Sequence, residues 1–486
     1  MEAAALSPPR MNRFLKHCAL PTFLSVVTSA CVTSPTARIA APYPRSEVIR
    51  SARWDLSGVA RTRTGLGSDL WPLTWGRDGD LYTAWGDGGG FEGTEESQQT
   101  GRASLGFARI GGIPDPRNPS SYRGHNLWGT VPYAESQATF GGKVDDIISV
   151  DGILYAQGGI WTRENCGCPD PTQKGGDNRV RTLAWSSDLG KSWTLAPWSA
   201  MRGLGATLQF GRDYREALDP LHIYLYYQET ARPVLYLRRV KRHSLAVNPS
   251  SPGHFEYFSG LGPDGEPTWS AMEAKAATVF TDSRAPVGTN IGPAVAYDAA
   301  LGRFLMVAFH GPLAGQIGIF ESASPWGPWA TVAYYENWGG FNETAGEGNG
   351  VTFPTKWISA NGRTLWAVFS GLKTSEVNFF DSFNVAKLTL RTRRGLPRIK
   401  APVAERSLPA GTTVTARGSG SKLTWSAIRM RADGQLAVSE RLQSGTGSTF
   451  RFTIPADVGP SELIRVTLTA NGTGRVYRDY TITDTR

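Results

Sequence analysis

Two aspartates, Asp69 and Asp87, are the residues of this sequence best placed for acid–base chemistry. They flank two short apolar segments joined by a Gly- and Asp-rich turn, a pattern that predicts a β-hairpin. If Trp75 pairs with Leu81, Asp69 falls opposite Asp87, with Cβ atoms ~5 Å apart. Like charges that close would destabilise a purely structural strand, whereas two carboxylates can pass a proton to and from a substrate. The alternative is a strand cap and a turn residue.

The same counting on other hairpins predicts a ring of polar residues at the end that carries Asp69. It places Lys143 near Ile160 and Asn290 opposite His310. Polar groups facing one another across such a mouth suit hydrogen bonding to a sugar, and an aromatic residue suits stacking. Each residue also has a structural alternative, as a rim charge or a core side chain. The candidate substrate-binding residues are Trp71, Lys143, Arg202, Asn290, His310 and Glu343.

The elements that would position these residues are five hairpins. Composition favours an all-β chain, since 56 Gly, 31 Pro and 16 Trp in 486 residues fit short strands joined by tight turns. An apolar run, a turn and a second apolar run recur about 60 to 80 residues apart, which predicts a five-bladed β-propeller spanning residues 51–395. The hairpins cover residues 71–85, 147–155, 206–227, 294–309 and 353–369.

One turn has a recognisable sequence. Residues 186–193 read Ser-Ser-Asp-Leu-Gly-Lys-Ser-Trp, the pattern of an Asp-box. We expect Asp188 and the serines to bond turn amides, Gly190 to take positive φ, and Trp193 to fill the blade. Such turns lie away from active sites, so this motif indicates fold more than activity.

Residues 401–486 form a second predicted domain. Short alternating strands follow one another there, as in 412–416, 423–427, 449–454 and 463–469. This pattern predicts an Ig-like or fibronectin-like β-sandwich. Its expected roles are spacing, packing or carbohydrate contact.

The N-terminal segment predicts export. Read from Met11, a basic stretch, a short apolar stretch and small residues form a signal peptide over residues 1–31. Cys31 directly follows the small residues, which suggests lipidation, with plain secretion as the alternative. Residues 32–50 then form a linker. We therefore expect an exported protein, either lipid-anchored at the cell surface or outer membrane, or secreted or periplasmic.

The net charge and the cysteines limit which binding partners and cofactors are expected. The net charge of +9 accompanies no nucleic-acid-binding module, so no nucleic acid is expected, and the basic run 238–243 reads as a solvated strand end. Cys166 and Cys168 lack nearby partners for zinc and suggest a strained loop disulfide or two free thiols. We expect a monomer without cofactor or catalytic metal, leaving a structural cation such as calcium open.

Several stretches together resemble a large, mostly uncharacterised bacterial propeller family that also contains endo-D-arabinanases. The resemblance rests on residues 68–75, 86–88, 185–193, 325–329 and 353–359, and extends over about 53–390. This family is similar in plan to arabinanase-like and sialidase-like glycosidases. The chain departs from it in the Gly-rich stretch 336–349, the Cys166–Cys168 loop and the added C-terminal domain.

The resemblance implies a glycoside hydrolase acting on a polysaccharide or complex glycan, with Asp69 and Asp87 as its catalytic aspartates. One carboxyl group would protonate the leaving oxygen and the other would activate water or attack carbon. By analogy, inversion is favoured, with Asp69 as base and Asp87 as acid. Two alternatives remain: a uronate polysaccharide lyase using His310 as base, and a non-catalytic propeller that binds glycans or surfaces.

Overall fold

The computed structural model divides the chain into residues 1–40 and a compact unit of residues 41–486, to which everything below refers. No helix in the described part is long and apolar enough to cross a membrane. The structure describes residues 40–57, 63–94, 103–115, 117–118, 121–129, 140–162, 180–200, 204–219, 221–228, 232–263, 265–285, 293–313, 315–338, 350–370, 381–394, 396, 398–401, 407–432, 437–459, 462–470 and 474–483.

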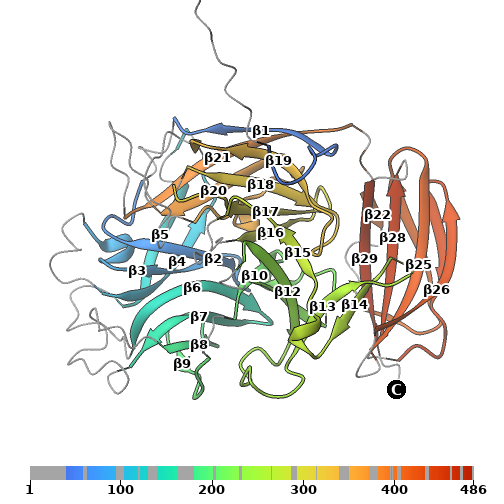
Figure 1. Cartoon of the computed structure of the whole chain (residues 1–486), viewed down its shortest axis with the longest axis horizontal. Helices are drawn as coiled ribbons and strands as arrows, with labels where there is room; N and C mark the ends of the chain where they lie inside the picture. Colours follow the sequence, from blue (N-terminus) through green and yellow to red (C-terminus); the bar gives the residue numbers. More distant parts are fainter. Residues whose placement is uncertain are drawn as a thin grey trace, which may run out of the picture. The chain divides into compact units, whose positions relative to one another are not determined.

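The chain is all-β, as predicted (Figure 1). Its helical elements in the described part are single 3-10 turns. Those turns are η1 (Gly90–Glu92), η5 (Arg212–Tyr214), η6 (Glu273–Lys275) and η8 (Thr355–Trp357).

Two four-stranded antiparallel sheets come first, and in each of them the strands pair in sequence order. The predicted hairpins 71–85 and 147–155 are confirmed as the pairs β2–β3 and β6–β7. The first sheet holds β2 (Asp69–Trp75), β3 (Leu81–Gly86), β4 (Leu105–Gly112) and β5 (Tyr122–Trp128). The second holds β6 (Gly141–Val150), β7 (Ile153–Trp161), β8 (Val180–Ser186) and β9 (Thr194–Leu195).

A ten-stranded sheet follows, made of two antiparallel groups that meet where β10 pairs in parallel with β16. The hairpins β10–β11 and β16–β17 are those predicted from sequence. The first group holds β10 (Ala206–Gln209), β11 (His222–Gln228), β12 (Val234–Lys241), β13 (Phe255–Leu261), β14 (Pro267–Ser270) and β15 (Thr278–Thr281). The second holds β16 (Ala294–Asp298), β17 (Arg303–Phe309), β18 (Ile317–Ser322) and β19 (Ala330–Tyr335).

The fifth predicted hairpin is only partly regular. Its second arm is β20 (Thr364–Ser370), but the first arm is η8 with isolated bridges on either side, Thr352 to Val368 and Ile358 to Leu365. β20 pairs with β21 (Phe383–Thr392), which pairs on its other edge with the N-terminal strand β1 (Ile49–Asp55). The last sheet before the C-terminal region therefore contains the first strand of the described residues.

Two smaller sheets make up the C-terminal region and share one hydrophobic core. Trp425 stacks on Phe450 within that core, with ring centroids 5.7 Å apart. One sheet holds β22 (Arg398–Ala401), β24 (Thr413–Ser419) and β27 (Thr449–Thr453). The other holds β23 (Ser407–Pro409), β29 (Gly474–Thr483), β28 (Leu463–Ala470), β25 (Leu423–Ala432) and β26 (Ala437–Thr446).

The first strands of successive sheets contact one another, and the series of contacts returns to β2. β2 contacts β6, β6 contacts β10, and β10 pairs with β16. The 3-10 turn η8 contacts both β16 and β2, and β20 also contacts β2. Hydrophobic clusters fill the spaces between consecutive sheets, and Trp85 and Phe107 of the first sheet are nearly or fully buried there. Face-to-face packing of successive sheets thus holds the first strands together.

The turn between β8 and β9 has the hydrogen bonds predicted for residues 186–193. Asp188 accepts from the Ser192 amide at 2.9 Å, and Ser186 Oγ accepts from the Gly190 amide at 2.8 Å. Gly190 has φ +83°, which glycine adopts without steric cost. Trp193 stacks on Phe107 at 3.8 Å, so the turn is fixed to the neighbouring sheet.

Candidate active site

Asp69, Asp87 and Lys143 form one cluster of charged side chains. The Nζ atom of Lys143 lies 3.2 Å from Oδ1 of Asp69 and 2.8 Å from Oδ1 of Asp87. Exposure is low for all three side chains, 17% for Asp69, 18% for Asp87 and 13% for Lys143. An ammonium group between two carboxylates offsets their mutual repulsion, which would otherwise be costly at this depth. Three residues predicted from two different hairpins are therefore adjacent.

The hairpin that carries Asp69 has the predicted pairing only near its turn. Trp75 pairs with Leu81, as expected, but Asp69 pairs with Gly86 instead of Asp87. The predicted register is therefore wrong by one residue at the open end. Asp87 directly follows Gly86 in the chain. The carboxylates of Asp69 and Asp87 therefore still bind the same lysine, Lys143.

A β-bulge in β2 causes this shift. The register slips between Leu70 and Leu73, and Leu70 and Trp71 have φ values of +76° and +58°. Bulges re-aim side chains and are enriched beside active sites. Positive φ on two large residues also stores backbone strain, which the surrounding packing must hold in place. The bulge therefore determines that Asp69 pairs with Gly86, the last residue of β3.

The glycine run after β3 positions Asp87. Asp87 has φ +47°, and its amide donates to the Ser104 carbonyl at 3.3 Å. Gly88 has φ +83°, and a Cβ at this position would overlap with the carbonyl oxygen of Gly67. The glycines thus allow two backbone segments to touch beside Asp87.

Gly86 lies directly against the charged cluster. A Cβ at this position would overlap with Asp69 Oδ1 and would lie 2.6 Å from Lys143 Nζ. Because the clashing atoms belong to an ion pair, even alanine would displace a charged group. Gly86 is therefore part of the site, although it has no side chain of its own.

Lys143 belongs to β6, where a second bulge alters the predicted register. Lys143 pairs with Gly159, whereas the sequence counting placed it near Ile160. The register then slips so that Asp145 falls outside the ladder and Asp146 pairs with Gln157. Since strand side chains alternate, one extra residue brings Lys143 and Asp146 to the same face of β6.

Asp146 is a partly buried carboxylate that the sequence analysis missed. Its Oδ2 atom accepts hydrogen bonds from the Gln157 side chain and the Thr207 amide, both at 3.1 Å. Burial raises the pKa of Asp146 to about 6. Its neighbour Asp145 instead pairs with Arg181 near the surface. The Asp-Asp dipeptide within an apolar strand was the available signal, but only the bulge shows that Asp146, and not Asp145, lies on the same face of β6 as Lys143.

Asp69 itself has a perturbed pKa. Burial raises the pKa of Asp69 to about 6, and the charges of Asp87 and Asp381 add to this while Lys143 opposes it. Asp381 precedes β21, and its carbonyl accepts the Gly67 amide at 2.7 Å, next to the turn that leads into Asp69. The sequence analysis also missed Asp381, which no motif connects with β2. A carboxyl group whose pKa lies near 6 can act as a general acid.

Trp71 and His310 are core residues in this structure. Trp71 is fully buried and contacts Phe91 and Phe383, so it offers no face to a sugar. His310 is 1% exposed, its Nε2 lies 2.9 Å from the Tyr335 carbonyl oxygen, and its ring stacks on Tyr334 at 3.8 Å. Burial lowers the pKa of His310, so its ring is neutral at physiological pH. Neither residue is available to a ligand in this conformation.

The other predicted residues lie outside the part of the chain that the structure describes. These residues, singled out from the sequence, are Arg202, Asn290, Glu343, Cys31, Cys166 and Cys168. In the described part, no group of three or more His, Cys, Asp or Glu side chains is arranged to hold a metal ion.

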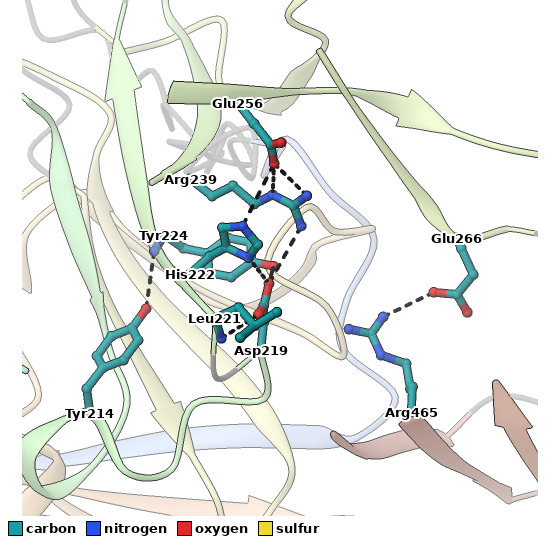
Figure 2. A network of polar contacts seen from close by, with 9 residues as sticks. All are labelled: Tyr214, Asp219, Leu221, His222, Tyr224, Arg239, Glu256, Glu266 and Arg465. Carbon is teal, nitrogen blue, oxygen red and sulfur yellow. Dashed lines mark hydrogen bonds and ion pairs between the residues drawn. The ribbon is translucent and has the colours of Figure 1, made fainter. Parts of the chain in front are cut away.

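A second polar cluster surrounds Asp219 and includes His222, the first residue of β11, and Arg239 of β12 (Figure 2). Asp219 lies 2.9 Å from His222 Nδ1 and 3.6 Å from Arg239, which also pairs with Glu256 at 2.6 Å. The partners of Asp219 hold the pKa of this carboxyl well below its usual range despite the burial. The cluster reads as a buried structural network.

This network corrects the expectation for the basic run 238–243. Arg238 and Arg239 are buried within β12 instead of being solvated. Arg238 lies over the ring of Phe255 at 4.0 Å, and Arg239 lies over Trp269 at 4.2 Å. Aromatic faces and carboxylates from other strands compensate these charges, which a sequence run alone does not reveal.

Comparisons with known proteins add little to this picture. No family model matches the chain, and no curated protein matches it. A putative hydrolase from Bacteroides ovatus ATCC 8483 is similar with a TM-score of 0.39 at 16% identity, over 69% of this chain and 90% of that chain. An α-L-arabinofuranosidase from Podospora anserina, in complex with cellotriose, gives 0.37 at 10% identity, over 71% and 99%.

A third similar structure is the GH43_1 enzyme from Xanthomonas citri complexed with xylotriose. Its TM-score is 0.36 at 15% identity, over 69% of this chain and 92% of that chain. TM-scores this low do not establish a shared fold. The proposals below therefore rest on the residues of this chain.

Proposed function

We propose that this protein is an exported glycoside hydrolase that acts on a polysaccharide or complex glycan through Asp69 and Asp87. The observation that carries the proposal is the pair of carboxylates on either side of the Lys143 ammonium, at 3.2 and 2.8 Å. Glycoside cleavage needs two carboxyl groups in different protonation states across one bond. The raised pKa of Asp69, about 6, means that this carboxyl group can hold a proton near neutral pH, as a general acid must.

The fold that goes with this function is, we propose, a five-bladed propeller with an Ig-like sandwich after it. Support comes from the contacts that join β2, β6, β10 and β16 and return through η8 to β2. The hydrophobic clusters between consecutive sheets support the same propeller architecture. Catalytic groups on the first strands would then face a common channel mouth, where many propellers bind ligands.

Two features of the cluster favour an enzyme over a passive binding surface. Leu70, Trp71 and Asp87 keep strained backbone conformations with positive φ, and they lie within or next to the charged cluster. Burial of three charges also costs free energy, which a structural site would avoid by using apolar residues. The lyase alternative has less support, because His310 is 1% exposed and its ring faces protein groups.

Activity on glycans tests the proposal. Wild type is incubated with a panel of bacterial and plant polysaccharides, and released reducing ends are measured. We expect Asp69→Asn and Asp87→Asn each to lower the rate by about 10³-fold, the order of magnitude lost with an acid or base. Asp145→Asn is the matched control, because Asp145 points away from the cluster toward Arg181. Absence of release by wild type on every glycan would contradict the proposal.

A further inference from the structure

The charged cluster is carried by three separate backbone segments. Asp69 opens β2, Asp87 directly follows β3, and Lys143 lies in β6. The ion pairs alone do not fix these segments, because a lysine ammonium on its flexible four-carbon chain can follow a carboxylate that moves. Hydrogen bonds of other groups must therefore set the distances between the three segments. Two buried serines and one buried asparagine make such bonds.

Ser68 joins the start of β2 to the loop that carries Asp87. Ser68 directly precedes Asp69 and is fully buried. Its Oγ atom accepts a hydrogen bond from the Gly90 amide at 2.8 Å. Its carbonyl oxygen accepts from Nε1 of Trp71 at 3.1 Å, so the backbone of the serine is itself fixed to the bulge of β2. One residue thus links the segment of Asp69 with the segment of Asp87.

Ser104 joins the same loop to the start of β6. It lies just before β4 and is buried. Its carbonyl oxygen accepts from the Asp87 amide at 3.3 Å, and its Oγ atom accepts from the Gly142 amide at 3.1 Å. Gly142 directly precedes Lys143 in the chain. Ser104 therefore contacts the backbone on both sides of the ion pair between Asp87 and Lys143.

Asn126 of β5 fixes the rest of the same loop. Its Nδ2 atom donates to the Gly89 carbonyl oxygen at 2.8 Å, and its Oδ1 atom accepts from the Phe91 amide at 3.1 Å. Asn126 is also buried. Together with the bond from Gly90 to Ser68, every residue from 89 to 91 has a buried side-chain partner. Such a loop is pre-organised, as a site needs when its groups must stay within about 0.5 Å of a productive geometry.

We propose that Ser68 and Ser104 are positioning residues of the active site, which keep Asp69, Asp87 and Lys143 at the distances that catalysis needs. This inference rests on the proposed hydrolase function. Each hydroxyl group bonds to a backbone amide and not to a carboxylate, so it acts on the chemistry only through the residues that it positions. A misplacement of about 1 Å can lower a rate by about a hundredfold.

Steady-state kinetics of alanine variants test the proposal, with the glycan that wild type cleaves fastest as substrate. Ser68→Ala and Ser104→Ala should each lower kcat about 10- to 100-fold and change KM by less than about threefold, because misplaced groups weaken the transition state more than the bound substrate. Wild-type kcat in both variants would overturn the inference.

Ser322→Ala is the matched control. Ser322 lies in β18 and is similarly buried, and its Oγ atom accepts the Ser324 amide at 3.1 Å. The control should lose about as much thermal stability as the two site variants, since each substitution leaves one buried amide without its acceptor. It should keep the wild-type kcat. An equal fall of kcat in the control would show a general effect of stability and would also overturn the inference.

A double variant shows whether Ser68 acts through the aspartate pair. In the Asp87→Asn background, the further change Ser68→Ala should lower kcat by less than about threefold, because the carboxylate that the serine positions is already absent. A loss as large as in the wild-type background would contradict the assignment of Ser68.

A measurement without substrate separates this inference from the hydrolase proposal. Carbon-13 NMR of carboxyl-labelled aspartate follows the titration of Asp69, whose signal is absent in Asp69→Asn. The charges of Asp87 and Asp381 add to the raised pKa of Asp69, and Lys143 opposes it. Ser104→Ala frees the backbone next to Lys143, so this pKa should rise further, by at least about 0.5. The control variant should not change it.

The two proposals therefore fail in different ways. If wild type cleaves no glycan, the hydrolase proposal is wrong, and the titration still shows whether Ser104 positions the charged cluster. If wild type cleaves a glycan but Ser104→Ala changes neither kcat nor the pKa of Asp69, the hydrolase proposal stands and the assignment of Ser104 is wrong.

Discussion

The buried carboxyl group of Asp69 lowers the free energy of unfolding at neutral pH. Its pKa is raised to about 6 chiefly by burial, so the folded chain binds this proton more tightly than the unfolded chain does. By linkage, the contribution of this group to stability falls as pH rises from about 4 to 6 and stays reduced above that. Asp69 therefore works against stability at neutral pH.

We therefore expect Asp69→Asn to be more stable than wild type at pH 7.5, by about 3 kcal/mol, the free energy that corresponds to the pKa shift. At pH 4, where Asp69 is protonated in the folded state, the difference should shrink toward zero. Urea unfolding at both pH values measures it. A variant less stable than wild type at pH 7.5 would show that the Lys143 ion pair outweighs the cost of burial.

At the scale of elements, bulges and a glycine bring the groups together. The bulge in β2 aligns Asp69 with Gly86, and the register slip in β6 puts Lys143 and Asp146 on the same face of that strand. A strand without these irregularities would present different residues, because one extra residue reverses which side chains face inward.

Gly86→Ala should lower activity by at least about tenfold with modest loss of stability, because a Cβ there overlaps with Asp69 and Lys143. Gly459→Ala is the matched control, since nothing lies within 4 Å of a Cβ at that position. Initial rates and thermal unfolding of both variants check the expectation. Full activity in Gly86→Ala would mean that the ion cluster rearranges without consequence for catalysis.

The same irregularities limit what the sequence predicts. Apolar alternation and turn residues were enough to predict the all-β class and four of the five hairpins. The register at Asp69 was not predictable, because nothing about a leucine and a tryptophan signals positive φ at residues 70 and 71. The burial of Trp71 and the location of Asp381 depend on packing between distant strands, which no local pattern encodes.

At the scale of the whole molecule, one buried ion pair joins the C-terminal sheets to the strands before them (Figure 2). Arg465 of β28 donates to Glu266, next to β14, at 3.1 Å, and both side chains are less than one-tenth exposed. Removal of one partner leaves the other charge buried and uncompensated, which costs more than loss of the pair.

We expect Arg465→Met and Glu266→Gln each to destabilise the protein by about 3 kcal/mol, and the double variant by clearly less than the sum. A double-mutant cycle from chemical denaturation measures this coupling. Strictly additive losses would show that the two side chains do not interact in solution. A single cooperative transition in wild type that splits in the variants would show that the pair also links the unfolding of the two regions.

The pairing of β1 with β21 has a consequence for the order of biosynthesis. Ile49 pairs with Thr392, so the edge of β1 is satisfied only after β21 has been synthesised. Until then, β1 presents unpaired backbone groups, and such edges template aggregation. A nascent chain therefore depends on shielding of this edge until β21 has emerged. Closure of the sheet would then be a late and rate-limiting step of maturation, because contacts between distant residues form slowly.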